Sequence, residues 1–178
     1  ARAALGLHDR PTLFTAARLE RWKGVDHLLH ALRFVPDVCL IVAGDGPEMP
    51  RLQALAREYD LAERVSFLGR VPRRAVYAYM RAADYFVLYS GYEGLPHTLL
   101  ECLQIGTPVI ASDKGGNPEV VQHDVNGLLV PYVNVNALAQ TIRDALTGDT
   151  RQRLDARTSS GLGQIGRASC RERVFPVV

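Results

Sequence analysis

The segment from residue 93 to residue 101 holds two acidic side chains around the expected start of a helix. Glu93 and Glu101 have seven residues between them, and Pro96 marks the place where the helix is expected to begin. The first backbone N–H groups of a helix have no partner within it, so they and the positive end of the helix dipole can receive an anion such as a diphosphate. Carboxylates so placed can accept hydrogen bonds from sugar or ribose hydroxyls. A structural interpretation stays open, in which Glu93 helps to cap the helix and Glu101 is a solvated helical residue.

Two basic side chains flank an earlier turn. Arg18 and Lys23 lie between the expected first strand and the expected first helix. Arginine offers a planar fork of donors and lysine a compact charge, so the pair can neutralise a phosphate. The same turn contains Arg21 and, taken alone, fits an ordinary exposed basic loop. Its coincidence with the acidic pair favours an anion site between them.

Short apolar runs alternate with helical patterns along the chain, and they predict the elements that position these residues. Strands are expected at residues 12–16, 38–43, 65–68, 85–89, 108–111 and 127–130. Helices are expected at residues 25–35, 47–59, 74–83, 98–105, 118–122 and 136–146. Continuously apolar strands joined through helices indicate an α/β protein with a Rossmann-like, doubly wound parallel sheet covered on both faces.

Glycine-rich loops follow most of the expected strands. They lie at residues 18–24, 44–47, 69–72, 91–96 and 115–118. Ligands of doubly wound sheets bind beyond the carboxyl ends of the strands, so these loops are expected to face one crevice. Gly44 and Gly46 resemble part of a dinucleotide fingerprint, but the third glycine of that motif is missing, which argues against a nicotinamide cofactor.

Composition and charge exclude several classes of protein. The 178 residues suffice for one domain with a sizeable core but not for two. A content of 47% hydrophobic and 22% charged residues is typical of a folded globular chain. The net charge of +2 arises within residues 158–178, so the remainder has no basic excess for nucleic acid.

The cysteines and the ends of the chain carry less information. Cys39, Cys102 and Cys170 are widely spaced without a metal-ligand pattern, so we expect reduced thiols, a cytoplasmic protein and no metal site. No apolar stretch approaches the roughly 20 residues of a membrane span. Residues 158–178 show neither helical nor strand periodicity, and we expect a domain at residues 1–157 followed by a disordered or non-native tail.

Six collinear motifs resemble a known family. They are residues 17–24 (ARLERWKG), 44–47 (GDGP), 67–71 (FLGRV), 93–101 (EGLPHTLLE), 106–111 (GTPVIA) and 115–121 (GGNPEVV). In order and spacing they are similar to the C-terminal domain of retaining glycosyltransferases of family 4, also called group 1, which have the GT-B fold. The resemblance covers roughly residues 5–150.

The resemblance implies a role for each matching residue. Arg18 and Lys23 would bind the diphosphate of a nucleotide sugar, Glu101 the ribose hydroxyls, and Glu93 the transferred sugar. The catalytic group would thus be Arg18, Lys23 and Glu93. Further donor contacts would come from the loop and helix start that comprise Gly94, Leu95, Pro96, His97 and Thr98, and from the backbone of Val71 against the base. Ala17 and His97 depart from the commoner Gly and Asn, and His97 could alter sugar preference.

The implied function is that of a donor domain. It would bind a UDP- or GDP-sugar for a retaining hexosyltransferase that needs neither metal nor cofactor, with charge stabilisation of the leaving phosphate rather than a protein nucleophile. The N-terminal acceptor-binding domain would be missing, so the fragment would be inactive, and the full-length protein could attach peripherally to a membrane. Two alternatives stay open: another GT-B enzyme, such as a sugar synthase or epimerase, and a noncatalytic nucleotide-binding module.

Overall fold

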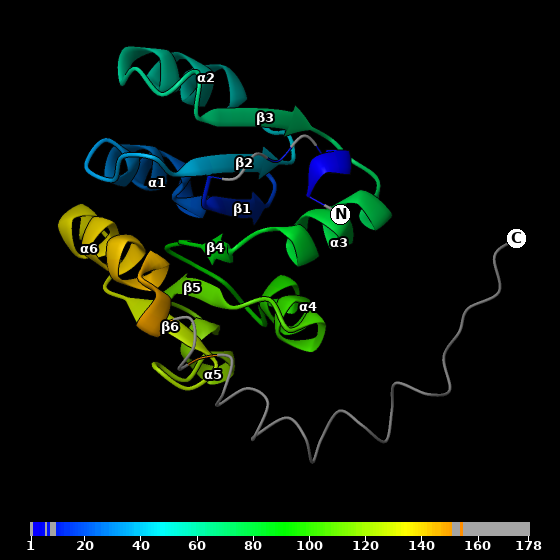
Figure 1. The fold of residues 1–178 in the computed structure, drawn as a ribbon, viewed down its shortest axis with the longest axis vertical. Helices are drawn as coiled ribbons and strands as arrows, with labels where there is room; N and C mark the ends of the chain where they lie inside the picture. The colour runs from blue at the N-terminus through cyan, green and yellow to red at the C-terminus, as the bar shows by residue number, and fades with distance from the viewer. Residues whose placement is uncertain (1, 6, 8–9, 151–153, 155–178) are drawn as a thin grey trace, which may run out of the picture.

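The described residues form one six-stranded sheet in which every pairing is parallel. The computed structural model describes residues 2–5, 7, 10–150 and 154 (Figure 1). The strands are β1 (Thr12–Ala16), β2 (Cys39–Ala43), β3 (Val65–Gly69), β4 (Tyr85–Leu88), β5 (Val109–Ser112) and β6 (Gly127–Val130). Their order is β3-β2-β1-β4-β5-β6, which confirms the expected doubly wound sheet.

Helices cover both faces of this sheet. They are α1 (Val25–Leu32), α2 (Met49–Glu58), α3 (Arg73–Ala82), α4 (His97–Ile105), α5 (Asn117–Val120) and α6 (Val135–Leu146), with short 3₁₀ turns η1 (Ala3–Leu5) and η2 (Arg21–Lys23). Helices α1, α2 and α6 lie on one face, and α3 and α4 lie on the other (Figure 1). The sheet is therefore the middle of three layers.

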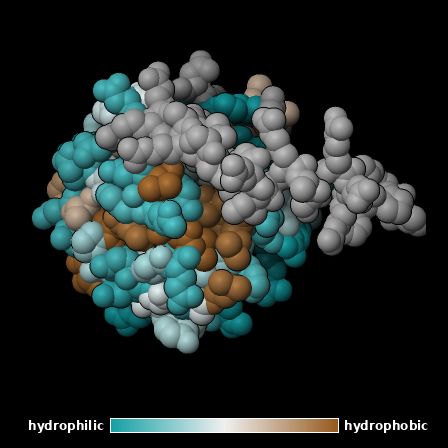
Figure 2. Space-filling model, turned by 90° about the horizontal axis from the view of Figure 1, so that it is seen from below, coloured by the Kyte–Doolittle hydropathy of each residue, from teal (hydrophilic) through white to brown (hydrophobic). Residues whose placement is uncertain are grey.

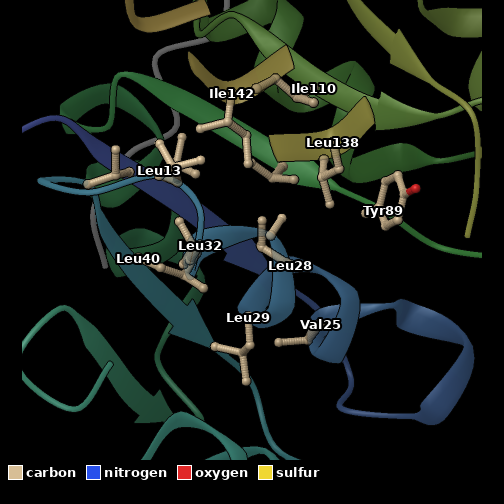
Figure 3. Packing of buried hydrophobic residues seen from close by; sticks show 14 of the residues in the cluster. Leu13, Val25, Leu28, Leu29, Leu32, Leu40, Tyr89, Ile110, Leu138 and Ile142 are labelled. Atoms are coloured by element: carbon tan, nitrogen blue, oxygen red, sulfur yellow. The ribbon is translucent and has the colours of Figure 1, made fainter. Parts of the chain in front are cut away.

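Alternation along the strands explains why their sequences are continuously apolar. Leu13 and Leu40 face the cluster beneath α1 and α6, whereas Phe14 and Ile41 face the cluster beneath α3 and α4. Figure 3 shows the first cluster, in which side chains of β1, β2, α1 and α6 meet. Since both faces are covered, most positions of both sets are apolar.

The element ends differ slightly from those expected. Helix α1 ends at Leu32 rather than at residue 35, because Phe34 and Val35 donate to carbonyls three residues earlier and tighten the chain into a turn. Helix α2 begins at Met49 rather than at Pro47, since Gly46 and the residues after it form a turn first. The proposed tail at residues 158–178 lies outside the described residues.

The topological switch lies between β1 and β4. From β1 the chain builds β2 and β3 on one side, then returns to place β4 on the other side. The loops after β1 and β4 touch: Gly91 N donates to the Trp22 carbonyl at 2.7 Å. A side chain at Gly24 would lie 2.0 Å from the Tyr89 carbonyl oxygen, so only glycine permits this approach.

The far end of the sheet carries an edge strand. Strand β6 is the last strand in the sheet order and lies low in Figure 1, beside α5. Seen from that end, the surface includes a band of hydrophobic residues between hydrophilic ones (Figure 2). This end is separated from the switch point by β4 and β5.

Candidate donor site at the carboxyl edge

The carboxylate of Glu93 is held at the switch point through one oxygen. Its Oε1 accepts hydrogen bonds from Lys23 Nζ at 2.7 Å and from Ser90 Oγ at 2.5 Å. The Lys23 and Glu93 side chains are only 19% and 13% exposed, so water screens this ion pair less than a surface pair. The sequence placed these residues on opposite sides of an anion, whereas the structure joins them directly.

The end of β5 and the loop after it hold the segment that carries Glu93 in place. Ser112 Oγ donates to the Ser90 carbonyl at 2.5 Å and accepts from Asn117 Nδ2 at 3.0 Å. Gly116 N donates to the Glu93 carbonyl at 3.0 Å. Sequence reasoning did not identify Ser90, Ser112 or Asn117 as supports, because their role depends on strands that meet only in the fold.

Two glycines allow the supporting loop to approach this closely. A Cβ atom on Gly115 would lie 2.3 Å from the Glu93 carbonyl oxygen, and one on Gly116 would lie 2.0 Å from the Gly94 carbonyl oxygen. From the sequence this segment was expected to face the crevice. The structure places it in direct backbone contact with the loop that carries Glu93.

Helix α4 begins next to this ion pair. His97 N donates to the Leu95 carbonyl at 2.9 Å, and the N–H groups of Leu99 and Leu100 donate to the Pro96 carbonyl. Within the part of the chain that the structure describes, the N–H groups of Gly94, Leu95 and Thr98 have no hydrogen-bond partner. These N–H groups and the helix dipole make the start of α4 suited to a negatively charged group.

A cavity of about 510 Å³ lies beyond the carboxyl ends of β1, β2 and β3. Its lining residues come from the loops after these strands and from α3: Ala16, Ala17, Arg18, Ala43, Gly44, Asp45, Gly46, Arg70, Val71 and Val76. The cavity thus brings together Arg18 and Val71, two of the residues selected from the sequence. Arg18 is 75% exposed, and its Nε lies 2.7 Å from Glu20 Oε1.

Glu101 points toward helix α3 rather than being a free surface residue. Its Oε1 accepts from Tyr77 Oη at 3.2 Å and from Arg73 Nη2, and its side chain is 25% exposed. The hydrogen bond to Tyr77 and the charge of Glu101 raise the pKa of the Arg73 guanidinium. The sequence singled out Glu101 but neither Arg73 nor Tyr77, which reach it from another helix.

Within the described part of the chain, the other chemically active side chains form no metal-binding cluster. Among the described residues, no three His, Cys, Asp or Glu side chains are grouped as metal ligands. Burial raises the pKa of the Cys102 thiol and so favours its protonated form. The searched part of the chain contains no helix that combines the length and apolarity of a membrane span.

Comparison with known proteins identifies the family of this chain. The sequence profile described as "Glycosyl transferases group 1" matches residues 1–160. A GDP-mannose-dependent alpha-(1-6)-phosphatidylinositol monomannoside mannosyltransferase of Mycolicibacterium smegmatis is 33% identical over 93% of this chain and 44% of the relative. This chain therefore spans less than half of that relative.

Solved structures agree with the family match. The crystal structure of Anabaena HepE in complex with UDP has a TM-score of 0.83 and 28% identity, and covers 93% of this chain and 47% of that one. The fold is also that of the C-terminal domain of a Francisella tularensis glycosyl transferase group 1 protein, LpcC, with a TM-score of 0.77, 21% identity and coverage of 86% and 85%. This chain thus belongs to the glycosyl transferases group 1 family and has the Rossmann-like fold of a GT-B glycosyltransferase.

Proposed function

We propose that the carboxyl edge of the sheet binds a nucleotide-diphosphate sugar and serves as the donor half of a retaining hexosyltransferase. The observation that carries this proposal is the junction of Lys23, Glu93 and the unpaired N–H groups at the start of α4. Cationic and N–H donors stand there beside an acidic acceptor. An activated sugar needs that combination, because its diphosphate is anionic and its hydroxyls donate hydrogen bonds.

Each part of the donor has a matching environment. The nucleoside would occupy the cavity of about 510 Å³, with its base against the backbone of Val71. The diphosphate would lie between Arg18, Lys23 and the N–H groups of Gly94, Leu95 and Thr98. Glu101 would then bind the ribose and Glu93 the sugar. The Oε2 atoms of these glutamates accept no hydrogen bond from any residue that the structure describes.

The chemistry requires charge stabilisation more than a nucleophile. As the glycosidic bond to phosphate breaks, positive charge develops at the anomeric carbon and negative charge on the leaving diphosphate. Lys23, Arg18 and the fixed N–H groups of α4 stabilise that negative charge without a metal ion. Glu93 orients the sugar, and attack of the acceptor on the same face from which the diphosphate leaves retains the configuration.

The whole enzyme would need a second half. Because the chain spans less than half of the mannosyltransferase and of HepE, we assign the acceptor site to an N-terminal domain of a cytoplasmic protein, which could attach peripherally to a membrane. The base stays open between guanine and uracil. The mycobacterial relative is named for GDP-mannose, and the Anabaena structure contains UDP.

Calorimetric titration of the purified chain with GDP, UDP and ADP tests the proposal. We expect GDP or UDP to bind, and Lys23→Ala to weaken that binding about tenfold or more through loss of a charge-assisted contact. Arg21→Ala is the matched control, since it removes an exposed positive charge from the same turn. A folded chain that binds none of the three nucleotides, or a Lys23→Ala variant that binds as tightly as the parent, contradicts the proposal.

A second measurement tests the division of labour between the halves. The isolated chain is expected to bind donor but to transfer no sugar to acceptor, because the acceptor site lies in the other domain. Product formation by the chain alone would contradict this assignment.

A further inference from the structure

Helix α3 presents two side chains to Glu101. Arg73 and Tyr77 are four positions apart, which places them on the same face of a helix, and this face is directed at α4. Both side chains donate to the same carboxylate atom, Oε1 of Glu101. The carboxylate is thus fixed through one oxygen from a neighbouring helix.

The hydrogen bond from Arg73 to Tyr77 sets the direction of the hydrogen bond from Tyr77 to Glu101. Arg73 Nε donates to Tyr77 Oη at 2.6 Å, so the lone pairs of the tyrosine are engaged from the arginine side. The single phenolic hydrogen is then left to point at Glu101, where Oη lies 3.2 Å from Oε1. The result is a closed triangle that restricts the rotation of the Glu101 side chain and leaves its Oε2 open.

Helix α3 connects the triangle to the cavity proposed for the nucleoside. Val71 precedes α3 and Val76 lies within it, and both line the cavity, while Tyr77 is the next residue along the helix. Helix α3 therefore borders the cavity and also holds Glu101. In the proposed binding mode, the ribose that links a base in this cavity to a diphosphate at α4 would lie against the open oxygen of Glu101.

We propose that Arg73 and Tyr77 are positioning residues that fix Glu101 to accept the ribose 2′-hydroxyl, so that the site selects ribonucleotides over 2′-deoxyribonucleotides. This inference rests on the proposed donor function and extends it to sugar recognition within the nucleotide. A prearranged acceptor loses less rotational freedom on binding than a mobile one, so its hydrogen bond contributes more to affinity.

A simple surface ion pair makes a different prediction. Arg73 is 73% exposed, and an exposed pair contributes little to stability. If the contact only neutralised charge, removal of Arg73 would change the affinity for both nucleotide types by the same factor. The ratio of the two affinities therefore separates positioning from general electrostatics.

The experiment compares GDP with 2′-deoxy-GDP, and UDP with 2′-deoxy-UDP, by calorimetry on the purified chain. We expect the parent to prefer the ribonucleotide by about tenfold to a hundredfold, the range of a hydrogen bond to a charged group. Tyr77→Phe and Arg73→Ala should each lower this preference by about threefold to tenfold while the affinity for the deoxynucleotide stays nearly constant. Glu101→Gln removes the charged acceptor itself, so this variant should show the lowest preference for the ribonucleotide in the series.

Arg74→Ala is the matched control. It removes an exposed arginine from the same helix turn, and no contact with Glu101 is present at that position. Thermal unfolding of each variant shows that the fold is retained. A preference that survives Tyr77→Phe and Arg73→Ala, or that is absent in a nucleotide-binding parent, overturns the positioning role. A parent that binds none of these nucleotides instead overturns the donor function itself.

Discussion

Lys23 and Glu93 are 70 positions apart in the chain, yet Lys23 Nζ lies 2.7 Å from Glu93 Oε1. Lys23 ends the turn after β1, and Glu93 lies in the loop after β4, so the pair joins the two strands between which the sheet changes direction. The ion pair therefore links the two sides of the candidate site. It also holds the charge of each side chain in place before any ligand arrives.

The Lys23–Glu93 pair should contribute to stability. Lys23→Met and Glu93→Gln each leave a partly buried charge without its opposite charge, and each should lower the free energy of unfolding by about 1–3 kcal/mol. The double variant should lose less than the sum of the two, as measured by urea denaturation. Lys114→Met is the control, because its pair with Asp113 is exposed and 3.9 Å long. Strict additivity of the two single effects would argue against a direct interaction.

Substitutions at Gly116 and Gly94 should separate an effect on stability from an effect on nucleotide binding. Gly116→Ala places a Cβ 2.0 Å from the Gly94 carbonyl oxygen, so it should displace the Glu93 loop and lower the unfolding free energy by about 1–3 kcal/mol. Gly94→Ala meets no atom within 4 Å and should leave the melting temperature nearly unchanged. Because Gly94 lies in the loop proposed to contact the phosphates, the added methyl group should crowd the ligand there and still weaken nucleotide binding severalfold. Equal melting temperatures for the two variants would show that the contact at Gly116 is relaxed in solution.

Arg18 should act on phosphate rather than on the nucleoside. Arg18→Ala should weaken binding of GDP or UDP by about tenfold and leave binding of the free nucleoside unchanged. The Arg18 side chain is 75% exposed, so salt screens its charge. Its contribution to the affinity for GDP or UDP should therefore shrink as NaCl is raised from about 50 mM to about 500 mM. Titration calorimetry at the two salt concentrations measures this. An equal loss for nucleoside and nucleotide would place Arg18 against the base instead.

Tyr89 should make the protein sensitive to alkali. Burial raises the pKa of Tyr89, whose Oη donates to the Pro131 carbonyl at 2.6 Å. The folded state therefore keeps this proton at a pH where the unfolded state has released it. The stabilisation is fully present below the ordinary value of about 10 and is lost as the pH rises above it.

Urea denaturation between pH 8 and pH 11.5 measures this loss. Tyr89→Phe should be less stable at pH 8 by about 1–2 kcal/mol, through the lost hydrogen bond, but should show a shallower decline above pH 10. The exposed Tyr92 supplies the control variant Tyr92→Phe, which should decline as steeply as the parent. A parallel decline of parent and Tyr89→Phe would assign the alkaline effect to other tyrosines, such as Tyr132, whose pKa burial also raises.

The fold was readable from the sequence because its signal is local. Continuously apolar runs and helical spacing are properties of a few neighbouring residues, so β4 and α6 were predicted within about one residue. The crevice followed from a rule for parallel sheets, and Arg18 and Val71 do line one cavity.

Side-chain partners were less predictable because they depend on elements far apart in the chain. Nothing near Glu101 in the sequence indicates Arg73, which reaches it from α3 across a separation of 28 positions. The bond between Lys23 and Glu93 requires the close approach of Trp22 and Gly91, which only the packed loops create. The sequence therefore singled out Lys23, Glu93 and Glu101 as candidates, whereas their contacts had to come from the structure.

The place of β1 in the middle of the sheet sets a minimum length for any working piece of this chain. Strand β1 pairs with β2 on one side and with β4 on the other, and β4 begins only at Tyr85. A version that stops before that point leaves one edge of its central strand bare, with N–H and C=O groups free to pair with another molecule. Such a truncation would lack the acidic side of the crevice and would be prone to self-association, so any shortened version needs to extend through β4 and past Glu93.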